Sequence, residues 1–297
     1  GTQLTAETLS LTETVAGTSS LIVNVASGTT ATFANISATT FSTSTDSVTI
    51  NGTTGNETIT GPDIAATISG GSGNDAITGG SQADIIDGGA GADNLSGGDG
   101  NDTLTGGAGN DSLTGGSGND TYLFNTNDVD AGETITEAAS GGTDTISVVT
   151  TTDFVNMSDA SFDEIEVINF GGANQTATFT GTQLTAETLS LTETVAGTAN
   201  LVINVGTGEN ADFTTITANT FDSGSDTLTI NGSTGGETIL GPDIASEIFG
   251  NVGNDNLTGG SSVDVINGGN DNDTLDGNGG ADTLTGGSGD DVYLFNS

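Results

Sequence analysis

The residues of this chain whose type and spacing could do chemistry are its aspartates. The chain has 40 Asp and Glu residues but no Lys, Arg, His or Cys. An Asp recurs every nine residues in two blocks, six times in the first block and five times in the second. These aspartates are Asp75, Asp84, Asp93, Asp102, Asp111 and Asp120, then Asp255, Asp264, Asp273, Asp282 and Asp291. Carboxylates at a fixed spacing, with no cationic side chain to neutralise them, predict bound metal cations.

Each Asp is the sixth residue of a glycine-rich nonapeptide, such as the one at 106–114. The nonapeptides begin at Gly70, Gly79, Gly88, Gly97, Gly106 and Gly115, then at Gly250, Gly259, Gly268, Gly277 and Gly286. Their eighth residue is apolar or Tyr throughout: Ile77, Ile86, Leu95, Leu104, Leu113 and Tyr122, then Leu257, Ile266, Leu275, Leu284 and Tyr293. A flexible acidic linker is the plain alternative, but it has no use for this apolar position. Such regular repeats predict stacked units that bury their apolar side chains together.

The elements that must position these aspartates are tight turns and short strands. The glycine-rich six residues predict a turn, because Gly tolerates positive φ, and the last three predict a strand whose middle residue points inward. Two nonapeptides then form one coil of 18 residues, and turns on one side stack at about 4.8 Å. The Asp of one turn therefore faces the Asp two repeats later. Carboxylate and carbonyl oxygens suit Ca²⁺, and the same-side pairs predict about seven sites.

The pattern Gly-Gly-x-Gly-x-Asp-x-apolar-x resembles the RTX family of calcium-binding repeats, strictly over 70–123 and 250–294. The resemblance implies an all-β fold, a right-handed parallel β-roll or β-solenoid with Ca²⁺ in both rows of turns. Degenerate turns precede each block, and their sixth residues are Glu57, Ala66, Glu237 and Ser246. Glu57 and Glu237 are therefore two further candidate metal ligands.

Composition supports folding that depends on a cation. The formal charge is −40, hydrophobic residues make up 32% and the chain holds 49 glycines. Low hydrophobicity with high charge is the usual signature of disorder, and a bound cation can supply the missing folding energy. We expect no nucleic-acid partner and no direct membrane insertion, because no basic side chain can meet a phosphate and no apolar run is long enough to span a bilayer.

A larger repeat of 180 residues contains the nonapeptides, since residues 1–18 return unchanged at 181–198. We expect four segments: a Thr/Ser-rich β segment at 1–51, a first β-roll at 52–125, a Thr/Ser-rich β segment at 126–231 and a second β-roll at 232–297. The Thr/Ser-rich segments favour a wider β-solenoid stacked on the rolls. A separate β-sandwich is the alternative.

Catalysis is not expected. The chain has no imidazole base, thiol, lysine or arginine, which removes most nucleophilic and acid–base mechanisms. A glycosidase that uses carboxylates alone remains the formal alternative.

The sequence favours an extracellular structural protein of a bacterial cell surface, forming a surface layer, a fibre or a matrix by self-association. The family resemblance implies export of an unfolded chain by type I secretion and folding in external Ca²⁺. The alternatives are the stalk of a giant adhesin and a non-catalytic module of a secreted enzyme or toxin. An ice-binding surface is disfavoured, because the third position of the nonapeptides carries no row of Thr.

Overall fold

The computed structural model describes residues 10–11, 20–33, 37–38, 47–137, 141–221 and 224–295. Most of the predicted segment 1–51 therefore lies outside the described residues. The chain forms two compact units, residues 1–147 with 156–164, and residues 148–155 with 165–297. The described secondary structure is nearly all β, and neighbouring strands of the rolls pair in parallel, as β10 (Asn94–Asp99) does with β12 (Ser112–Ser117) and β25 (Glu247–Val252) with β27 (Val265–Asn270). The predicted parallel β-roll or solenoid is confirmed.

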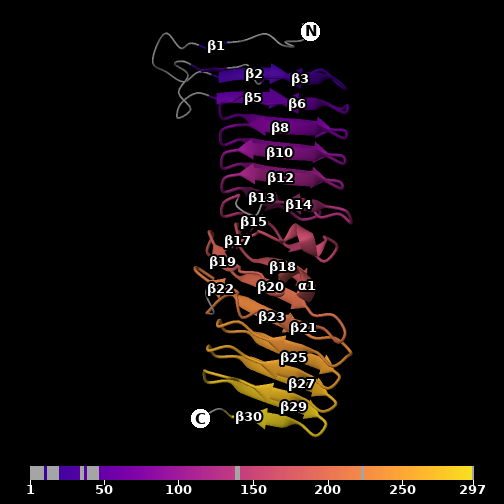
Figure 1. The fold of residues 1–297 in the computed structure, drawn as a ribbon, viewed down its shortest axis with the longest axis vertical. Helices are drawn as coiled ribbons and strands as arrows, with labels where there is room; N and C mark the ends of the chain where they lie inside the picture. The colour runs from indigo at the N-terminus through magenta and orange to yellow at the C-terminus, as the bar shows by residue number, and fades with distance from the viewer. Residues whose placement is uncertain are drawn as a thin grey trace. The chain divides into compact units, whose positions relative to one another are not determined.

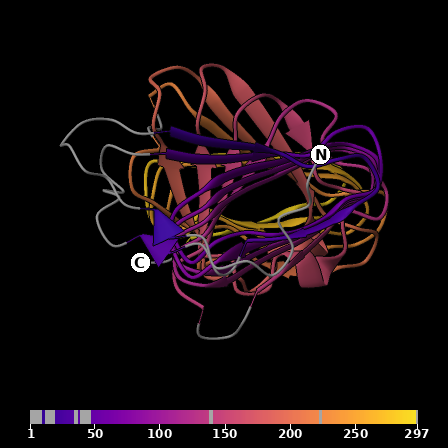
Figure 2. The same ribbon diagram turned by 90° about the horizontal axis from the view of Figure 1, so that it is seen from above.

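Unit 1 consists of stacked coils, and each coil contributes one strand to each of two sheets (Figure 1). The strands of the first sheet are β2 (Ser20–Asn24), β5 (Ser47–Asn51), β7 (Thr67–Ser72), β9 (Ile85–Ala90), β11 (Thr103–Ala108), β13 (Thr121–Phe124) and β15 (Thr145–Val148). Those of the second are β3 (Thr30–Thr32), β6 (Thr58–Thr60), β8 (Ala76–Gly80), β10 (Asn94–Asp99), β12 (Ser112–Ser117) and β14 (Thr134–Thr136). Two short strands, β1 (Ser10–Leu11) and β4 (Ser37–Ala38), pair with each other, and η1 spans Asp159–Ser161. Seen along the stack, the coils of unit 1 lie one above another (Figure 2).

Unit 2 repeats this arrangement. One sheet holds β16 (Thr152–Asp153), β18 (Gln175–Thr180), β20 (Ala199–Asn204), β23 (Thr227–Asn231), β25 (Glu247–Val252), β27 (Val265–Asn270) and β29 (Thr283–Ser288). A second holds β21 (Asn210–Asp212), β24 (Thr238–Leu240), β26 (Asn256–Thr258), β28 (Thr274–Asp276) and β30 (Val292–Leu294). Strands β17 (Val167–Phe170), β19 (Ser190–Glu193) and β22 (Thr217–Ala218) pair in that order, and helix α1 spans Gly181–Leu184.

The register follows the sequence period. Within the nonapeptides, paired residues lie 18 positions apart, as in Leu95↔Leu113 and Ile248↔Ile266. Before the nonapeptides the spacing is wider: Ser20 pairs with Ser47, and Asn200 pairs with Thr227 at the same spacing in unit 2. The described part of the Thr/Ser-rich segments thus forms solenoid coils that are longer than those of the rolls.

The core is a narrow column of the eighth-position side chains. In unit 1 all six are at most 2% exposed, because each points inward from the middle of its strand. In unit 2 the first three are equally buried, but Leu284 is half-buried and Tyr293 is 41% exposed. The wider coils bury aromatic side chains instead, and the rings of Phe154 and Phe179 stack with centroids 4.6 Å apart.

The strands are longer than the sequence pattern predicts. Strand β11, for example, continues through Gly106 and Gly107 of the next repeat. Gly107 has φ +99°, and a Cβ there would overlap the carbonyl oxygen of Gly89 in the neighbouring coil. This close approach of backbone to backbone explains the second glycine of the motif. In the described part of the chain, no helix is long and apolar enough to cross a membrane.

Candidate metal centre

The sixth-position aspartates form two rows in each unit, one along each edge where the coils turn. In unit 1 we call them row A and row B, and in unit 2 row C and row D. Row A is Asp75, Asp93 and Asp111, row B is Asp84, Asp102 and Asp120, row C is Asp255, Asp273 and Asp291, and row D is Asp264 and Asp282. All six of unit 1 and the first three of unit 2 are at most 2% exposed, whereas Asp282 and Asp291 are half-buried. The fold thus removes a series of carboxylates from water.

Within each row, consecutive aspartates are direct neighbours. The Oδ1 of one Asp accepts a hydrogen bond from the backbone N–H of the Asp 18 residues earlier, and all seven predicted same-side pairs make this bond. The N···O distances are 2.7–2.8 Å in unit 1 and 2.9–3.1 Å in unit 2. We call this series of hydrogen bonds along a row the ladder. It fixes Oδ1 of each carboxylate, and the turn then determines where Oδ2 points.

The second oxygen, Oδ2, is buried without a hydrogen-bond partner in most of these residues. This is true of Asp75, Asp84, Asp93, Asp102, Asp111, Asp120, Asp255 and Asp273. Buried polar atoms are normally paired, and an ionised carboxylate without a partner is costly. A row of such atoms at 18-residue spacing therefore indicates a row of cation-binding positions.

The space beside each Oδ2 is bordered by oxygen. A Cβ built on Gly97 would meet Asp102 Oδ2 and the carbonyl oxygen of Gly115, so both atoms border the position that the first glycine leaves free. Gly88 has the same relation to Asp93 Oδ2 and the Gly106 carbonyl oxygen. A cation between two coils would thus contact the Oδ2 of one Asp and a carbonyl oxygen of the next turn. The carboxylate of the next Asp in the row lies at the same gap, because its Oδ1 accepts a hydrogen bond from the N–H of the first Asp. All-oxygen donors of this kind fit Ca²⁺.

Burial raises the pKa of the nine row aspartates that are at most 2% exposed. Desolvation, with nearby carboxylates adding to it, raises the pKa of Asp84 to about 7 and the pKa of Asp93, Asp102 and Asp255 to about 6. The hydrogen bond at Oδ1 acts in the opposite direction but does not compensate. Without calcium, these four carboxyls would therefore hold protons between about pH 4 and 6 that an unfolded chain would release.

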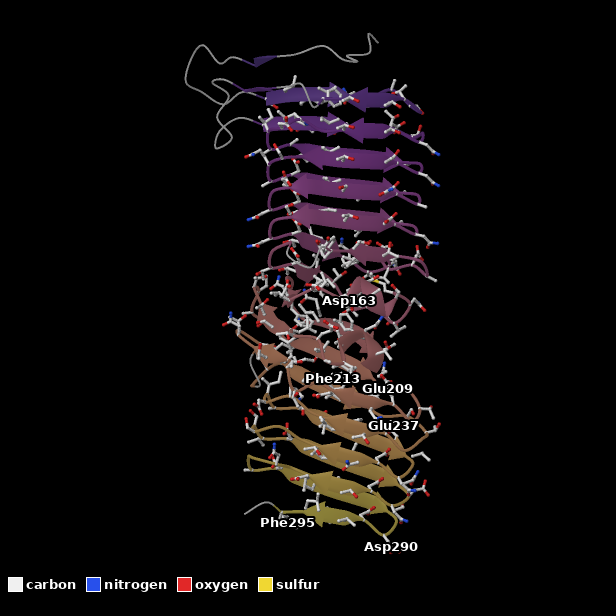
Figure 3. All side chains as sticks on the ribbon, viewed as in Figure 1. Asp163, Glu209, Phe213, Glu237, Asp290 and Phe295 are labelled. Atoms are coloured by element: carbon white, nitrogen blue, oxygen red, sulfur yellow. The ribbon has the colours of Figure 1, made fainter. Side chains whose placement is uncertain are left out.

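Glu57 and Glu237 extend rows A and C by one turn, but their carboxylates are already hydrogen-bonded. Glu57 accepts from the N–H groups of Gly28 and Thr53, at 2.6 and 2.9 Å. Glu237 accepts from Gly208 and Ser233, at 2.8 and 3.0 Å. Figure 3 shows Glu237 at the turn edge of unit 2. Their role as metal ligands stays a prediction, and the hydrogen bonds alone suffice to anchor the wider coil.

The turns of Ala66 and Ser246 offer no such position. A Cβ on Gly61 would meet the Cδ1 of Ile68 rather than a carboxylate oxygen, and one on Gly241 would meet the Cδ1 of Ile248. A methyl group thus fills the space that Oδ2 borders in the other turns. In addition, Ser246 and Gly260 donate hydrogen bonds to the two oxygens of Asp264.

Two buried acids that the sequence analysis missed continue the rows of unit 1. The N–H of Asp111 donates to Glu133 Oε2 at 3.0 Å, and that of Asp120 donates to Asp144 Oδ1 at 2.8 Å. Burial, with the nearby Asp111, raises the pKa of Glu133 to about 8, and its Oε1 has no partner. In the sequence, each of these acids stands two residues before an Ile, as the Asp of the motif stands two residues before its apolar residue. However, each follows the last Asp of its row by 22 or 24 residues rather than by 18.

Stacked parallel coils whose turns hold rows of buried carboxylates define a calcium-binding β-roll. The family model of the RTX calcium-binding nonapeptide repeat matches the chain four times, at residues 65–95, 87–122, 231–275 and 258–293. Both units therefore contain RTX calcium-binding nonapeptide repeats, as the motif predicts, and these repeats bind Ca²⁺. The comparisons with curated proteins and with solved structures found no match.

The raised pKa values predict that the calcium requirement depends on pH. Because the folded-state pKa of Asp84, Asp93 and Asp102 lies above that of an unfolded Asp, the folded apo-protein binds more protons between about pH 4 and 7. Its stability is therefore greatest in acid and declines as the pH rises through this window. Ca²⁺ must displace these protons, so we expect apparent calcium affinity to increase from about pH 5.5 to about pH 7.5. Calorimetric titration at several pH values measures this, and a constant affinity would contradict it.

Proposed function

We propose that this protein is an extracellular structural repeat protein of a bacterial cell surface that folds on binding Ca²⁺ and then associates with copies of itself. One observation carries the proposal. Rows of buried Oδ2 atoms without hydrogen-bond partners lie in the turns of a chain with 40 acids and no Lys, Arg or His. No side chain of the protein can neutralise them, so the folded state needs a cation from solution.

The proposed role is not enzymatic. The chain has no His, Cys, Lys or Arg, and so lacks the usual bases, nucleophiles and oxyanion-binding cations. The acids with the most strongly raised pKa values, Glu133 and Asp84, belong to the rows rather than to a separate cleft. Burial in the rows accounts for their pKa shifts without a catalytic function.

The same chemistry supports the proposed extracellular location. Calcium sites in extracellular modules typically bind in the range of about 10⁻⁴–10⁻³ M, which matches calcium outside cells. A chain that folds only at such concentrations would stay unfolded during type I secretion and fold outside. The two similar units favour an array, such as a surface layer, a fibre or a matrix. The stalk of a giant adhesin and a non-catalytic module of a secreted enzyme or toxin are the alternatives.

Self-association is expected to need Ca²⁺ beyond the amount that fills the rows. Seven divalent ions would neutralise 14 of the 40 negative charges, and the remaining charge repels a second copy. No Lys or Arg can form a cross-interface ion pair, so bridging Ca²⁺, Thr, Ser, Asn and backbone groups must supply the contacts. We therefore expect millimolar Ca²⁺ to promote assembly.

Light scattering and electron microscopy of the folded protein test this. Scattering should increase in CaCl₂ and stay unchanged in NaCl of the same ionic strength, because monovalent ions screen carboxylates without bridging them. A protein that folds in Ca²⁺ but stays monomeric throughout the millimolar range would contradict self-association. That result would favour the adhesin stalk.

A further inference from the structure

Row B ends at a cluster of three acids that no nonapeptide predicts. Asp120 is the last Asp of the row, Asp144 accepts the hydrogen bond of its backbone N–H, and Glu137 lies beside them. Asp120 is 1% exposed, and its Oδ2 has no hydrogen-bond partner. Glu137 is half-buried, and its Oε2 also lacks a partner. The unpartnered Oδ2 of Asp120 therefore points into a space that other carboxylates border.

In each turn of the rows, the space beside Oδ2 forms a gap between two coils. Glu137 takes the place of the backbone carbonyl that borders this gap in the other turns. A Cβ added to Gly97 would lie nearest to Asp102 Oδ2 and the carbonyl oxygen of Gly115. A Cβ added to Gly115 would instead lie nearest to Asp120 Oδ2 and Glu137 Oε1. The chain after Tyr122 leaves the nonapeptide pattern, so no glycine carbonyl follows at the same spacing. A side-chain oxygen occupies the equivalent position.

The distances fit a single cation. One carboxylate oxygen from each of Asp120, Glu137 and Asp144 lies within 4.8 Å of the others. Ca²⁺ binds oxygen at about 2.3–2.6 Å, so two ligands of one ion are at most about 5 Å apart. Three carboxylates at this separation repel one another unless a cation lies between them.

Tyr122 holds Glu137 in this position. Its phenolic oxygen accepts a hydrogen bond from the N–H of Gly115, at 2.6 Å, and its hydroxyl donates to Glu137 Oε1. Tyr122 is itself fully buried in the column of eighth-position side chains. The orientation of Glu137 is thus fixed from the core of the roll.

We propose that Asp120, Glu137 and Asp144 bind a further Ca²⁺ that closes row B where the nonapeptides end. The inference rests on the proposed calcium binding of the rows but adds a site whose ligands come partly from the segment after them. Because three carboxylates surround the ion, the site is more negative than a gap between two nonapeptides, which has two carboxylates and a carbonyl oxygen. The ion joins the last turn of the roll to Glu137 and Asp144, which come after the nonapeptides.

The position of Tyr122 provides a specific probe. The chain has two Tyr and no Trp, so in a Tyr293→Phe background Tyr122 is the only tyrosine. Tb³⁺ prefers the same oxygen ligands as Ca²⁺ and emits when a nearby tyrosine is excited. We expect Tyr122-sensitised Tb³⁺ emission that excess Ca²⁺ removes. Glu137→Gln should raise the Tb³⁺ concentration at half-maximal emission by at least about 10-fold, because loss of even an outer-shell partner of a metal ligand typically costs about 10- to 100-fold in affinity.

The matched control is Glu164→Gln, the same chemical change at an exposed residue of unit 1; its titration should equal that of the Tyr293→Phe protein. Asp144→Asn is the second variant, since its amide oxygen can still accept the Asp120 N–H, and it should weaken emission similarly. Circular dichroism in Ca²⁺ verifies that each variant folds. An unchanged titration in folded Glu137→Gln and Asp144→Asn would overturn this site alone. A parent protein that shows neither Tb³⁺ emission nor a calcium-dependent spectrum would overturn the proposed function as well.

Discussion

Removing Ca²⁺ at neutral pH should unfold both rolls. Without the ion, the buried carboxyl groups of rows A to D must either stay ionised without a counter-charge or take up a proton from neutral solution. Eight of their Oδ2 atoms have no hydrogen-bond partner. The effective penalty of one buried, uncompensated ion is several kcal/mol, whereas a whole domain is stable by only about 5–15 kcal/mol. Two or three uncompensated carboxylates are therefore enough to abolish the folded state. The 49 glycines add to this effect, because each loses much backbone entropy on folding.

Circular dichroism with and without a chelator, at low salt, measures this directly. We expect the β-sheet signal to disappear in excess chelator and to return when Ca²⁺ is restored. The control is NaCl at the ionic strength of the CaCl₂ solution, which should restore little of the signal. A β-rich spectrum that excess chelator leaves unchanged would refute calcium-dependent folding.

The nonapeptide part of the fold could be predicted from the sequence because three constraints have the same period. Glycine permits the turn, the eighth residue fills the core and the sixth residue supplies the carboxylate. Leu95 can face Leu113 only if Asp93 faces Asp111, so the register and the rows follow together. Departures from the motif also follow residue chemistry: Asn251, Asp271 and Asn278 replace glycines and adopt φ between +62° and +77°, a region that Asn and Asp tolerate.

The ends of the rows could not be predicted in the same way, because loops of variable length set the register there. Glu133 and Asp144 align with Asp111 and Asp120 only after insertions lengthen their coils to 22 and 24 residues. A period of nine cannot find them. Conversely, Glu57 has the expected position, but the wider coil before it supplies the N–H of Gly28 to its carboxylate. Whether a carboxylate is left unpartnered thus depends on the neighbouring coil rather than on its own motif.

Asp102→Asn is expected to remove more bound calcium and more stability than Asp84→Asn. Asp102 is central in row B: its Oδ1 lies against Asp84, and its Oδ2 borders the gap towards Asp120. Both of these gaps have a carboxylate on each side. The Oδ1 of Asp84, in contrast, faces Ala66, where the methyl group of Ile68 fills the equivalent space. Asp102 therefore serves two gaps and Asp84 serves one.

The amide oxygen of Asn can still accept the ladder hydrogen bond, so the substitution tests charge rather than backbone pairing. Leaving one buried carboxylate without its counter-charge costs about 3–5 kcal/mol. We expect the free energy of unfolding to fall by about that amount for Asp84→Asn and by nearly twice as much for Asp102→Asn, measured by urea unfolding in saturating Ca²⁺.

The matched control is Asp99→Asn, which changes an exposed residue on the same turn as Asp102 and should alter stability little. Calcium content by atomic emission should fall by two ions for Asp102→Asn and by one for Asp84→Asn. Equal losses for the two variants would mean that each gap binds its ion through one carboxylate alone, since only then would a central and a terminal Asp be equivalent.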